Sequence, residues 1–421
     1  MSSIVDELQW RGLVAQTTDE AALRAHLEGG RRTIYCGFDP TAPSLHFGNL
    51  VQLVLLGHLQ RAGHRVICLV GGSTGLIGDP RPTSERTLRP REETAANADR
   101  IRQLLQPFLD FTGSNPASVV NNLDWTADIS ALDFLRDLGK HFRVNQMIRK
   151  DAVAARLRSQ DGISYTEFSY QILQALDFLH LYQHENVTVQ TGGQDQWGNL
   201  TAGVDLVHRV EGATVHLLTT PLLTDSAGEK FGKSAGNAVW LSADMTTPWA
   251  FYQYWVNVDD VDVIRLLKVF TTRDADQIAA LATSHDQAPH RREAQQALAV
   301  DITTLVHGTQ TARRVRDASQ VLFGKADPHS IDADTLRDAV ADLPLARLDP
   351  GGSVVEALVA TGLAPSRGAA RRVMGEGGVS VNNVRVDDPE RLLTPDDYLH
   401  ARTALLRRGR RNLAAVQRVC G

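Results

Sequence analysis

The sequence contains only three cysteines among its 421 residues, at positions 36, 68 and 420. Because they are few, odd in number and far apart, they predict neither a disulfide framework nor a structural zinc site, and a reducing cytoplasm is the expected location. No stretch approaches the roughly 18 consecutive apolar residues that a membrane span requires. The first nine residues lack the basic and apolar regions of a secretory signal. We therefore expect a cytoplasmic protein without membrane association.

Lysine is also scarce, with six residues against 38 arginines. Two of the six, Lys230 and Lys233, stand three positions apart in Glu-Lys-Phe-Gly-Lys-Ser. Where arginine is the usual cation, paired lysines in a short segment indicate compact ammonium groups that reach a phosphate, although chance would give the same spacing. The rest of the composition, 43% hydrophobic and 22% charged, is typical of a soluble globular protein.

The charges are unevenly distributed along the chain. Residues 353–421 hold eleven arginines against seven acidic residues, whereas the whole chain has a net charge of −5. A basic tail on an acidic body indicates a module that binds a polyanion. A solvated basic face is the competing interpretation.

The first half of the chain has the pattern of a parallel sheet with crossover helices. Short runs of β-forming residues at 33–38 and 65–70 flank a helical stretch at 50–60, which predicts a βαβ unit. Further strand candidates follow at 118–121, 186–190 and 215–219. We predict a Rossmann-like, doubly wound α/β catalytic domain over residues 1–223, at roughly 100–200 residues per domain.

The second half predicts two smaller domains. Residues 224–320 contain the lysine segment and then helical spacing without a convincing strand. Residues 321–352 are rich in glycine and proline and predict a linker. Residues 353–421 predict a small α+β module with helices at 354–360 and 367–374 and a strand at 377–382.

Candidate ligand-binding residues follow the predicted strands, because open α/β sheets bind ligands at the carboxyl ends of their strands. The first such end reads Tyr-Cys-Gly-Phe-Asp-Pro-Thr from Tyr35, and His46-Phe47-Gly48-Asn49 then opens a helix. The second end holds four glycines between 71 and 78. Each has a bland alternative: His46 as a surface residue, Asn49 as a helix cap, and the glycines as plain turns.

A third group lies on one helix face. Tyr170, Gln174 and Asp177 share a narrow face at about 100° per residue, surrounded by apolar neighbours. Burying such groups costs free energy unless they are hydrogen-bonded, so we interpret the face as a polar pocket wall rather than a solvated stripe. Asp195 follows another strand and glycine pair; it can contact a ribose or simply cap a helix.

These elements, in this order, resemble the bacterial tyrosyl-tRNA synthetase family. His46 to Asn49 resembles the His-Ile-Gly-His signature at two positions, and Lys230-Phe231-Gly232-Lys233-Ser234 resembles Lys-Met-Ser-Lys-Ser at three of five. The surroundings are more specific, since 35–41, 71–80, 166–177 and 192–199 are all similar to the family. The tail resembles an RNA-binding module of the ribosomal-protein-S-four type.

The resemblance implies a role for each matching residue. Tyr35 and Asp177 would bind the phenolic hydroxyl of tyrosine; Asp79, Tyr170 and Gln174 its ammonium; and Gln196 would lie near its carboxylate. The ATP-binding residues would be Cys36, Gly37, Asp39, His46, Gly48, Asn49, Gly193, Asp195 and Lys233. The residues that stabilise the phosphates would be Thr41, His46, Arg86, Lys230 and Lys233. RNA would contact Arg367, Arg371, Arg372, Arg407, Arg408, Arg410 and Arg411.

The implied reaction activates L-tyrosine with ATP to tyrosyl-adenylate and pyrophosphate, and then transfers tyrosine to the 3′-terminal adenosine of its tRNA. Magnesium is expected with ATP, without a dedicated protein metal site, and a homodimer is implied; no DNA partner is expected. The family often has lysines between 78 and 86, where this chain reads Pro80-Arg81-Pro82-Thr83. Arg81 therefore replaces that cation, or Arg86 acts alone.

Three rival functions share part of this pattern. A tryptophanyl-tRNA synthetase would have the same fold and signatures, but Tyr35 with Asp177 suits a phenol. A different nucleotidyl-transferring enzyme would lack the polar helix face. A non-catalytic RNA-binding protein would have no reason to keep both signature lysines, His46 and Asp79.

Overall fold

The computed structural model describes residues 3–81, 84–160, 162–224, 231–234, 237–323, 327–341, 343–348, 351–409 and 412–419. Two compact units are present, one formed by residues 1–246 with 258–298 and the other by residues 247–257 with 299–421. In the described part of the chain, no helix is long and apolar enough to cross a membrane.

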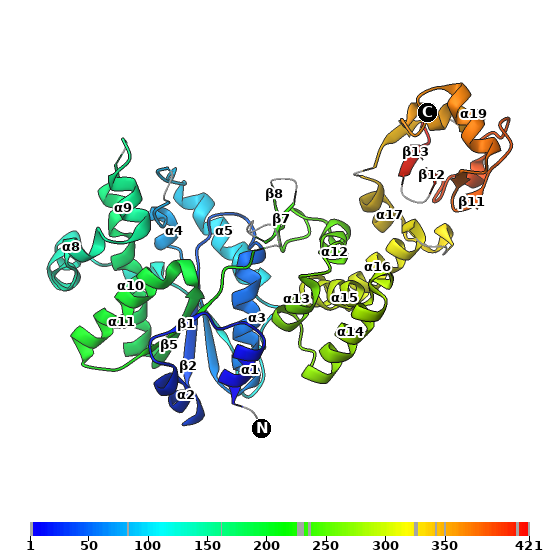
Figure 1. The fold of residues 1–421 in the computed structure, drawn as a ribbon. Helices are drawn as coiled ribbons and strands as arrows, with labels where there is room; N and C mark the ends of the chain where they lie inside the picture. The colour runs from blue at the N-terminus through cyan, green and yellow to red at the C-terminus, as the bar shows by residue number, and fades with distance from the viewer. Residues whose placement is uncertain are drawn as a thin grey trace. The chain divides into compact units, whose positions relative to one another are not determined.

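A six-stranded sheet forms the centre of the first unit (Figure 1). Its strands are β1 (Gln16–Thr17), β2 (Thr33–Phe38), β3 (Arg65–Val70), β4 (Ser118–Asn121), β5 (Val187–Gly193) and β6 (His216–Thr220), in the order β1-β6-β5-β2-β3-β4. Strands β2 to β6 are parallel and β1 is an antiparallel edge. The predicted doubly wound sheet is confirmed; β1 has only two residues, too few to show a hydrophobic alternation.

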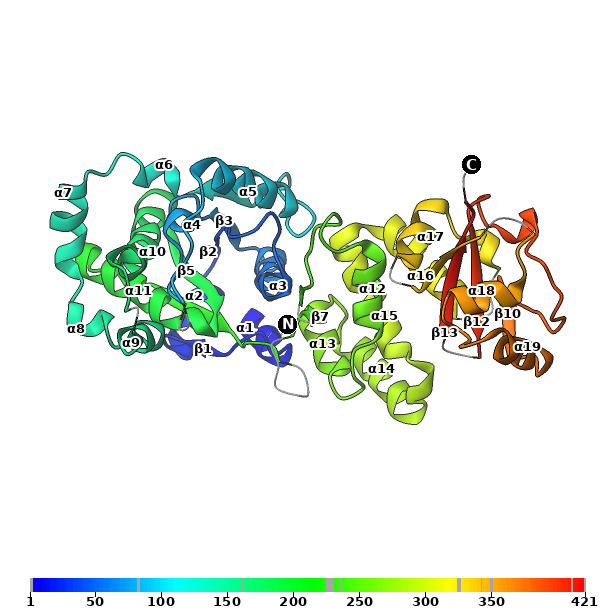
Figure 2. The same ribbon diagram turned by 90° about the horizontal axis from the view of Figure 1, so that it is seen from above.

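Helices cover both faces of this sheet. Helices α10 (Tyr165–Glu185) and α11 (Trp197–Glu211) lie on one face, and α1 (Ile4–Trp10) and α3 (Phe47–Arg61) on the other (Figures 1 and 2). Along β2, Tyr35 packs in the core beside Phe178 of α10, whereas the thiol of Cys36 meets Gln52 of α3. The alternating side chains of one strand thus reach both layers.

The remaining regular elements of the first unit are shorter. The helices are α2 (Glu20–Glu28), α4 (Thr74–Ile77), α5 (Arg91–Leu104), α6 (Leu123–Thr126), α7 (Ala131–Asp133), α8 (Val144–Met147), α9 (Asp151–Leu157), α13 (Val263–Phe270) and α14 (Ala275–Gln287). A two-stranded hairpin joins β7 (Lys233–Ser234) and β8 (Asn237–Ala238). Short 3-10 or π turns occur at Phe134–Leu138, Gly139–His141, Gln194–Gln196 and Pro289–Arg291.

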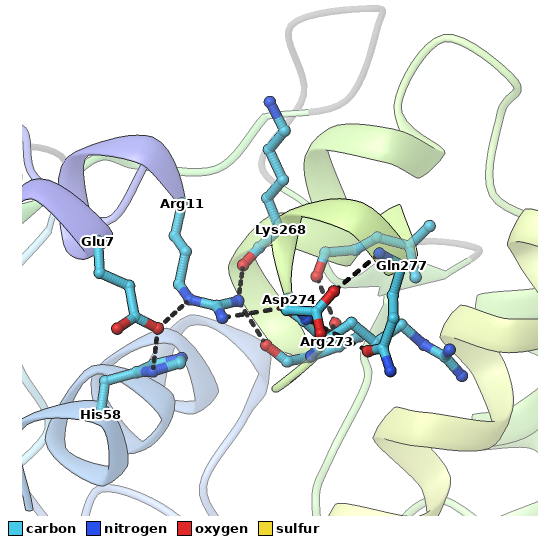
Figure 3. Close-up of polar contacts among 9 residues, drawn as sticks. Glu7, Arg11, His58, Lys268, Arg273, Asp274 and Gln277 are labelled. Atoms are coloured by element: carbon cyan, nitrogen blue, oxygen red, sulfur yellow. Dashed lines mark hydrogen bonds and ion pairs between the residues drawn. The ribbon is translucent and has the colours of Figure 1, made fainter. Parts of the chain in front are cut away.

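Arg11 ties the end of α13 to the sheet domain (Figure 3). Its buried guanidinium donates to the carbonyl oxygens of Lys268, Thr271 and Arg273 at 3.1, 2.8 and 3.0 Å. It also pairs with Glu7 of α1 at 3.0 Å. Carbonyl groups at a helix C-terminus have no partner within the helix, so a buried cation there satisfies them and complements the helix dipole.

The second unit combines helices with a five-stranded sheet. Its helices are α12 (Pro248–Val256), α16 (Thr309–Phe323), α17 (Ala333–Val340), α18 (Val354–Ala360) and α19 (Arg367–Gly375), while α15 (Glu293–His307) contributes to both units. Its strands are β9 (Leu345–Arg347), β10 (Val379–Val381), β11 (Val384–Arg385), β12 (Thr403–Arg408) and β13 (Asn412–Gln417), in the order β11-β10-β12-β13-β9. Short 3-10 turns lie at Pro328–Ser330 and Pro395–Asp397.

Residues 353–421, expected as an α+β tail, are one part of the second unit, which also includes residues 247–257 and 299–352. The predicted helices appear as α18 and α19 and the predicted strand as β10, around a core that includes Leu358, Met374 and Leu406. Strands β12 and β13, which the sequence analysis did not predict, extend this sheet beyond β10. Residues 321–352, expected as a linker, contain α17 and β9.

Candidate active site

The carboxyl ends of the parallel strands surround a cavity of about 470 Å³. The structure brings together there the predicted residues Tyr35, Cys36, Gly37, Asp39, Thr41, His46, Gly48, Asn49, Asp79, Arg86, Tyr170, Gln174, Asp177, Gly193, Asp195 and Gln196. Lys230 lies outside the described residues; Lys233 is placed by its backbone in β7, and its side chain is not described. Segments more than 150 residues apart thus line one cavity, as the strand-end argument requires.

The first turn of α3 forms one wall of the cavity. His46 is the N-cap: its Nδ1 accepts from the Gly48 amide at 3.0 Å, and the His46 amide donates to Asn49 Oδ1 at 3.1 Å. Asn49 therefore takes part in the helix cap, as its bland interpretation predicted. His46, expected in that interpretation as a surface residue, is exposed and is itself the N-cap, and both residues also line the cavity. A Cβ at Gly48 would lie 3.0 Å from His46 Cε1, so only glycine leaves the histidine ring its position.

A buried carboxyl and a buried hydroxyl mark the deep end of the cavity. Asp177, 2% exposed, accepts from Asn122 Nδ2 at 2.9 Å and from Trp125 Nε1 at 3.0 Å. Burial raises the pKa of Asp177 to about 8, against the opposing effect of those two donors. The hydroxyl of Tyr35, equally buried, has no hydrogen-bond partner among the described residues. An unsatisfied buried hydroxyl beside a carboxyl suits a ligand that carries its own hydroxyl group.

Asn122 and Trp125, which hold the Asp177 carboxyl, were not predicted by the sequence analysis. Both follow β4, whose carboxyl end meets the same sheet edge as β2 and β3. Their position directly after a predicted strand is the sequence feature that could have identified them. Asn122 also donates to Thr74 Oγ1 at 3.1 Å, which links this wall to the glycine-rich segment.

Asp39 contributes a second carboxyl group, which is half-buried. It accepts from Thr74 Oγ1 at 2.6 Å and from the Tyr170 hydroxyl at 2.7 Å. Burial raises the pKa of Asp39 above its usual value. A Cβ at Gly71 would lie 2.1 Å from Asp39 Oδ1, so this glycine is required by close approach. Tyr170, predicted to bind the ammonium of tyrosine, therefore donates its hydroxyl hydrogen to Asp39. Its hydroxyl oxygen remains able to accept a hydrogen bond from that ammonium.

Asp79 lies at the end of a chain of amide groups. Its Oδ2 accepts from Gln196 Nε2 and its Oδ1 from Asn199 Nδ2, each at 3.0 Å. Lys150 in turn donates to Asn199 Oδ1 at 2.8 Å. Gln196, expected near a carboxylate of the ligand, is thus also bound to a carboxylate of the protein. Asn199 and Lys150 were not predicted.

Arg86 is held in the cavity wall through both its backbone and its side chain. Its amide donates to Glu167 Oε1 at 2.6 Å, and its Nε donates to the Asp79 carbonyl at 2.8 Å. Glu167 pairs with Arg156 at 2.8 Å, and both side chains are 1% exposed. Arg81 is exposed, and its carbonyl oxygen accepts from Arg156 at 3.4 Å. Of the two arginines, only Arg86 lines the cavity.

The arginines predicted to bind RNA divide into two groups. Arg367, Arg371 and Arg372 are exposed on α19. Arg407 instead donates to the Leu322 carbonyl and to Asn383 Oδ1, and Arg408 donates to the Leu363 carbonyl at 2.6 Å. Arg407 and Arg408 therefore hold elements of the second unit together. Arg410 and Arg411 lie outside the described residues.

Comparison with known proteins agrees with this arrangement. A family model described as "tRNA synthetases class I (W and Y)" matches residues 28–324, and one described as "Tyrosine--tRNA ligase SYY-like C-terminal domain" matches residues 335–416. The tyrosine–tRNA ligase of Streptomyces griseus is 56% identical over 99% of both chains, and that of Acidothermus cellulolyticus is 54% identical over 99% of this chain and 100% of its own.

Solved structures of tyrosyl- and tryptophanyl-tRNA synthetases are similar to this chain. A C-terminally truncated mitochondrial tyrosyl-tRNA synthetase of Coccidioides posadasii superposes with a TM-score of 0.68 at 33% identity, over 76% of this chain and 92% of its own. A tryptophanyl-tRNA synthetase of Plasmodium falciparum shares the fold, with a TM-score of 0.53 at 12% identity.

The sheet, the cavity and the two signature segments define a class I aminoacyl-tRNA synthetase of the tryptophan and tyrosine group. Within that group, the chain belongs to the tyrosine–tRNA ligase family, and it charges tRNA with tyrosine.

Proposed function

We propose that the 470 Å³ cavity holds tyrosine and ATP together, with the phenol of tyrosine at its deep end. The observation that carries this proposal is the unpartnered Tyr35 hydroxyl buried beside Asp177. A phenol hydroxyl can donate to one of these groups and accept from the other, which satisfies both. Asn122 and Trp125 hold the carboxyl of Asp177 in place for that contact.

The other end of the amino acid lies toward Asp79 in this proposal. The α-ammonium binds Asp79, the hydroxyl oxygen of Tyr170 and the amide oxygen of Gln174, all of which line the cavity. Gln196 has one amide hydrogen on Asp79 and contributes to orienting the carboxylate of tyrosine. All three groups accept hydrogen bonds, and hydrogen bonds donated by a charged ammonium are stronger than those between neutral groups.

The nucleotide occupies the mouth of the cavity. We assign its ribose and base to Cys36, Gly37, Asp39, Gly48, Asn49, Gly193 and Asp195, and its phosphates to Thr41, His46, Arg86, Lys230 and Lys233. Burial raises the pKa of the Cys36 thiol to about 12, so this cysteine stays protonated and does not act as a nucleophile.

Tyrosyl-adenylate forms when a carboxylate oxygen of tyrosine attacks the α-phosphorus of ATP and pyrophosphate leaves. The carboxylate is already ionised at neutral pH, so no general base is required. The protein contributes positioning and cations that neutralise charge on the departing phosphates. In the second step, the 3′-terminal adenosine of tRNA attacks the activated carbonyl carbon and AMP leaves.

Magnesium enters with ATP in this proposal and neutralises phosphate charge. Among the described residues, no group of three histidine, cysteine, aspartate or glutamate side chains is placed to hold a metal ion. Asp39 and Asp79 are each already bound by two side-chain donors. The phosphate oxygens, which suit Mg²⁺, are therefore its expected ligands.

The domain organisation follows from these roles. We propose that residues 1–223 carry adenylate formation, residues 224–320 add the second signature and a helical tRNA-binding domain, and residues 353–421 form an RNA-binding module. Arg367, Arg371 and Arg372 are exposed on one short helix and are the described cations best placed to contact RNA phosphates.

We further propose a cytoplasmic homodimer. Large apolar side chains are exposed in one stretch of the first unit, namely Leu132, Leu135, Val144, Ile148, Leu157 and Tyr165. Exposed apolar groups concentrated in one stretch are typical of a surface that another protein covers. Sedimentation velocity tests this: we expect a dimer that Leu135→Glu with Ile148→Glu dissociates, whereas a monomeric wild type would contradict it.

The tyrosine site is tested by binding. Tyr35→Phe removes only the hydroxyl that has no partner among the described residues, so we expect calorimetry to show weaker tyrosine binding by about 0.5–1.5 kcal/mol, the net value of one hydrogen bond. The affinity for ATP should stay the same. Unchanged tyrosine affinity would exclude the phenol from this position.

A further inference from the structure

Lys150 lies just outside the cavity wall, at the start of α9. Its ammonium nitrogen is 2.8 Å from Asn199 Oδ1, and the side chain packs over Gly198, where a Cβ would lie 3.3 Å from Lys150 Cε. Lys150 does not line the tyrosine cavity; it lines a separate cavity of about 280 Å³. A half-buried lysine requires an explanation, because desolvating its charge costs free energy.

The hydrogen-bonding chemistry of the chain from Lys150 to Asp79 has only one consistent orientation. An ammonium group donates and cannot accept, so the carbonyl end of the Asn199 amide must face Lys150. The amino end of Asn199 then faces Asp79 Oδ1, at 3.0 Å, and Gln196 Oε1, also at 3.0 Å. The reversed amide would place an oxygen against the carboxylate of Asp79.

We propose that Lys150 is a positioning residue for tyrosine: by fixing the orientation of the Asn199 amide, it holds Asp79 where the α-ammonium of the amino acid binds. This inference rests on the proposed function, which assigns the ammonium to Asp79. Burial lowers the pKa of Lys150 to about 7, and the nearby Asp79 opposes that shift. The orienting role belongs to the ammonium form, because a neutral amine could also accept from the Asn199 amide.

The test compares two ligands in Lys150→Met, which keeps most of the length of the stem and removes the donor. L-Tyrosine carries the ammonium, whereas 3-(4-hydroxyphenyl)propionate lacks it and keeps the phenol and carboxylate. We measure the KM for tyrosine and the inhibition constant of the propionate in pyrophosphate exchange. The expected result is a rise in the KM for tyrosine of about tenfold or more, with a change below about twofold for the propionate and a smaller change in kcat.

Two controls separate this inference from the proposed function. Lys140→Met removes an exposed lysine and should change neither ligand. Asp79→Asn should weaken tyrosine selectively if the ammonium binds Asp79; equal effects on both ligands would refute that assignment. If Asp79→Asn is selective but Lys150→Met weakens both ligands equally, or neither, the positioning role is refuted alone.

Misfolding of Lys150→Met can be distinguished from the proposed effect. Binding of the propionate reports an intact phenol pocket in the same sample. If Lys150→Met binds neither ligand, Lys150→Gln, which retains an N–H donor, is measured in the same way. It must show a selective loss for tyrosine that is smaller than the loss in Asp79→Asn; an equal loss for both ligands would overturn the proposal.

Discussion

Asp177 should decide between tyrosine and phenylalanine. Phenylalanine fills the cavity but leaves the Tyr35 hydroxyl and the Asp177 carboxyl buried without a ligand partner. Each missing hydrogen bond to a buried polar group costs about 1–3 kcal/mol, so the two contacts together supply about 2–6 kcal/mol, or a preference of about 30-fold to 10⁴-fold for tyrosine. Asp177→Ala removes the carboxyl contact, which contributes about 1–3 kcal/mol, so the preference for tyrosine over phenylalanine should fall by about 5-fold to 150-fold.

The assay is pyrophosphate exchange with each amino acid, and the measured quantity is kcat/KM. For Asp177→Ala we expect the tyrosine value to fall much further than the phenylalanine value. Asp195→Ala is the matched control: it removes a carboxyl from the same cavity at the proposed nucleotide end, so both amino acids should lose activity equally. Equal losses in Asp177→Ala as well would refute the phenol assignment and leave Asp177 as a support for the fold.

Three further predictions follow from individual residues. Lys233→Ala should slow adenylate formation by at least tenfold and leave tyrosine affinity unchanged, because an ammonium on the phosphates acts mainly in the transition state; unaltered single-turnover rates would remove it from that role. Arg371→Glu with Arg372→Glu should spare pyrophosphate exchange but weaken tRNA charging at physiological salt, since both side chains are exposed on α19; full charging would contradict this. The raised pKa of Asp177 means that the folded chain binds a proton that the unfolded chain releases between pH 4 and 8, so stability falls with rising pH in that window by up to about 1.4 kcal/mol per unit. Urea unfolding at pH 5 and 7.5 should show a smaller fall for Asp177→Ala; an identical fall would contradict the shift.

The parallel sheet and the cavity lining could be predicted because both follow from local patterns. Strands β2, β3 and β4 appear as runs of β-forming residues with the predicted bounds. Residues that follow such strands necessarily meet at one edge, so Tyr35 and Asp79 could be placed together without coordinates. The face formed by Tyr170, Gln174 and Asp177 followed from helical spacing alone.

The supporting residues could not be predicted, because their partners are distant in sequence. Glu167 reaches the backbone of Arg86 from 81 positions away, and Lys150 reaches Asn199 from 49. No periodicity marks such pairs. Arg407 was also misleading: a basic run indicates an exposed face, but pairing in β12 brings this side chain to the Leu322 carbonyl at the end of α16.

The central claim is that tyrosine and ATP react in this cavity to form tyrosyl-adenylate and pyrophosphate. Exchange of labelled pyrophosphate into ATP by the purified full chain tests it most directly. The account predicts exchange that requires L-tyrosine and that L-tryptophan does not support. Tyr35→Phe with Asp177→Ala should reduce this exchange by the sum of the two single effects, about 1.5–4.5 kcal/mol. Exchange without an amino acid, or equal exchange with tryptophan, would contradict it.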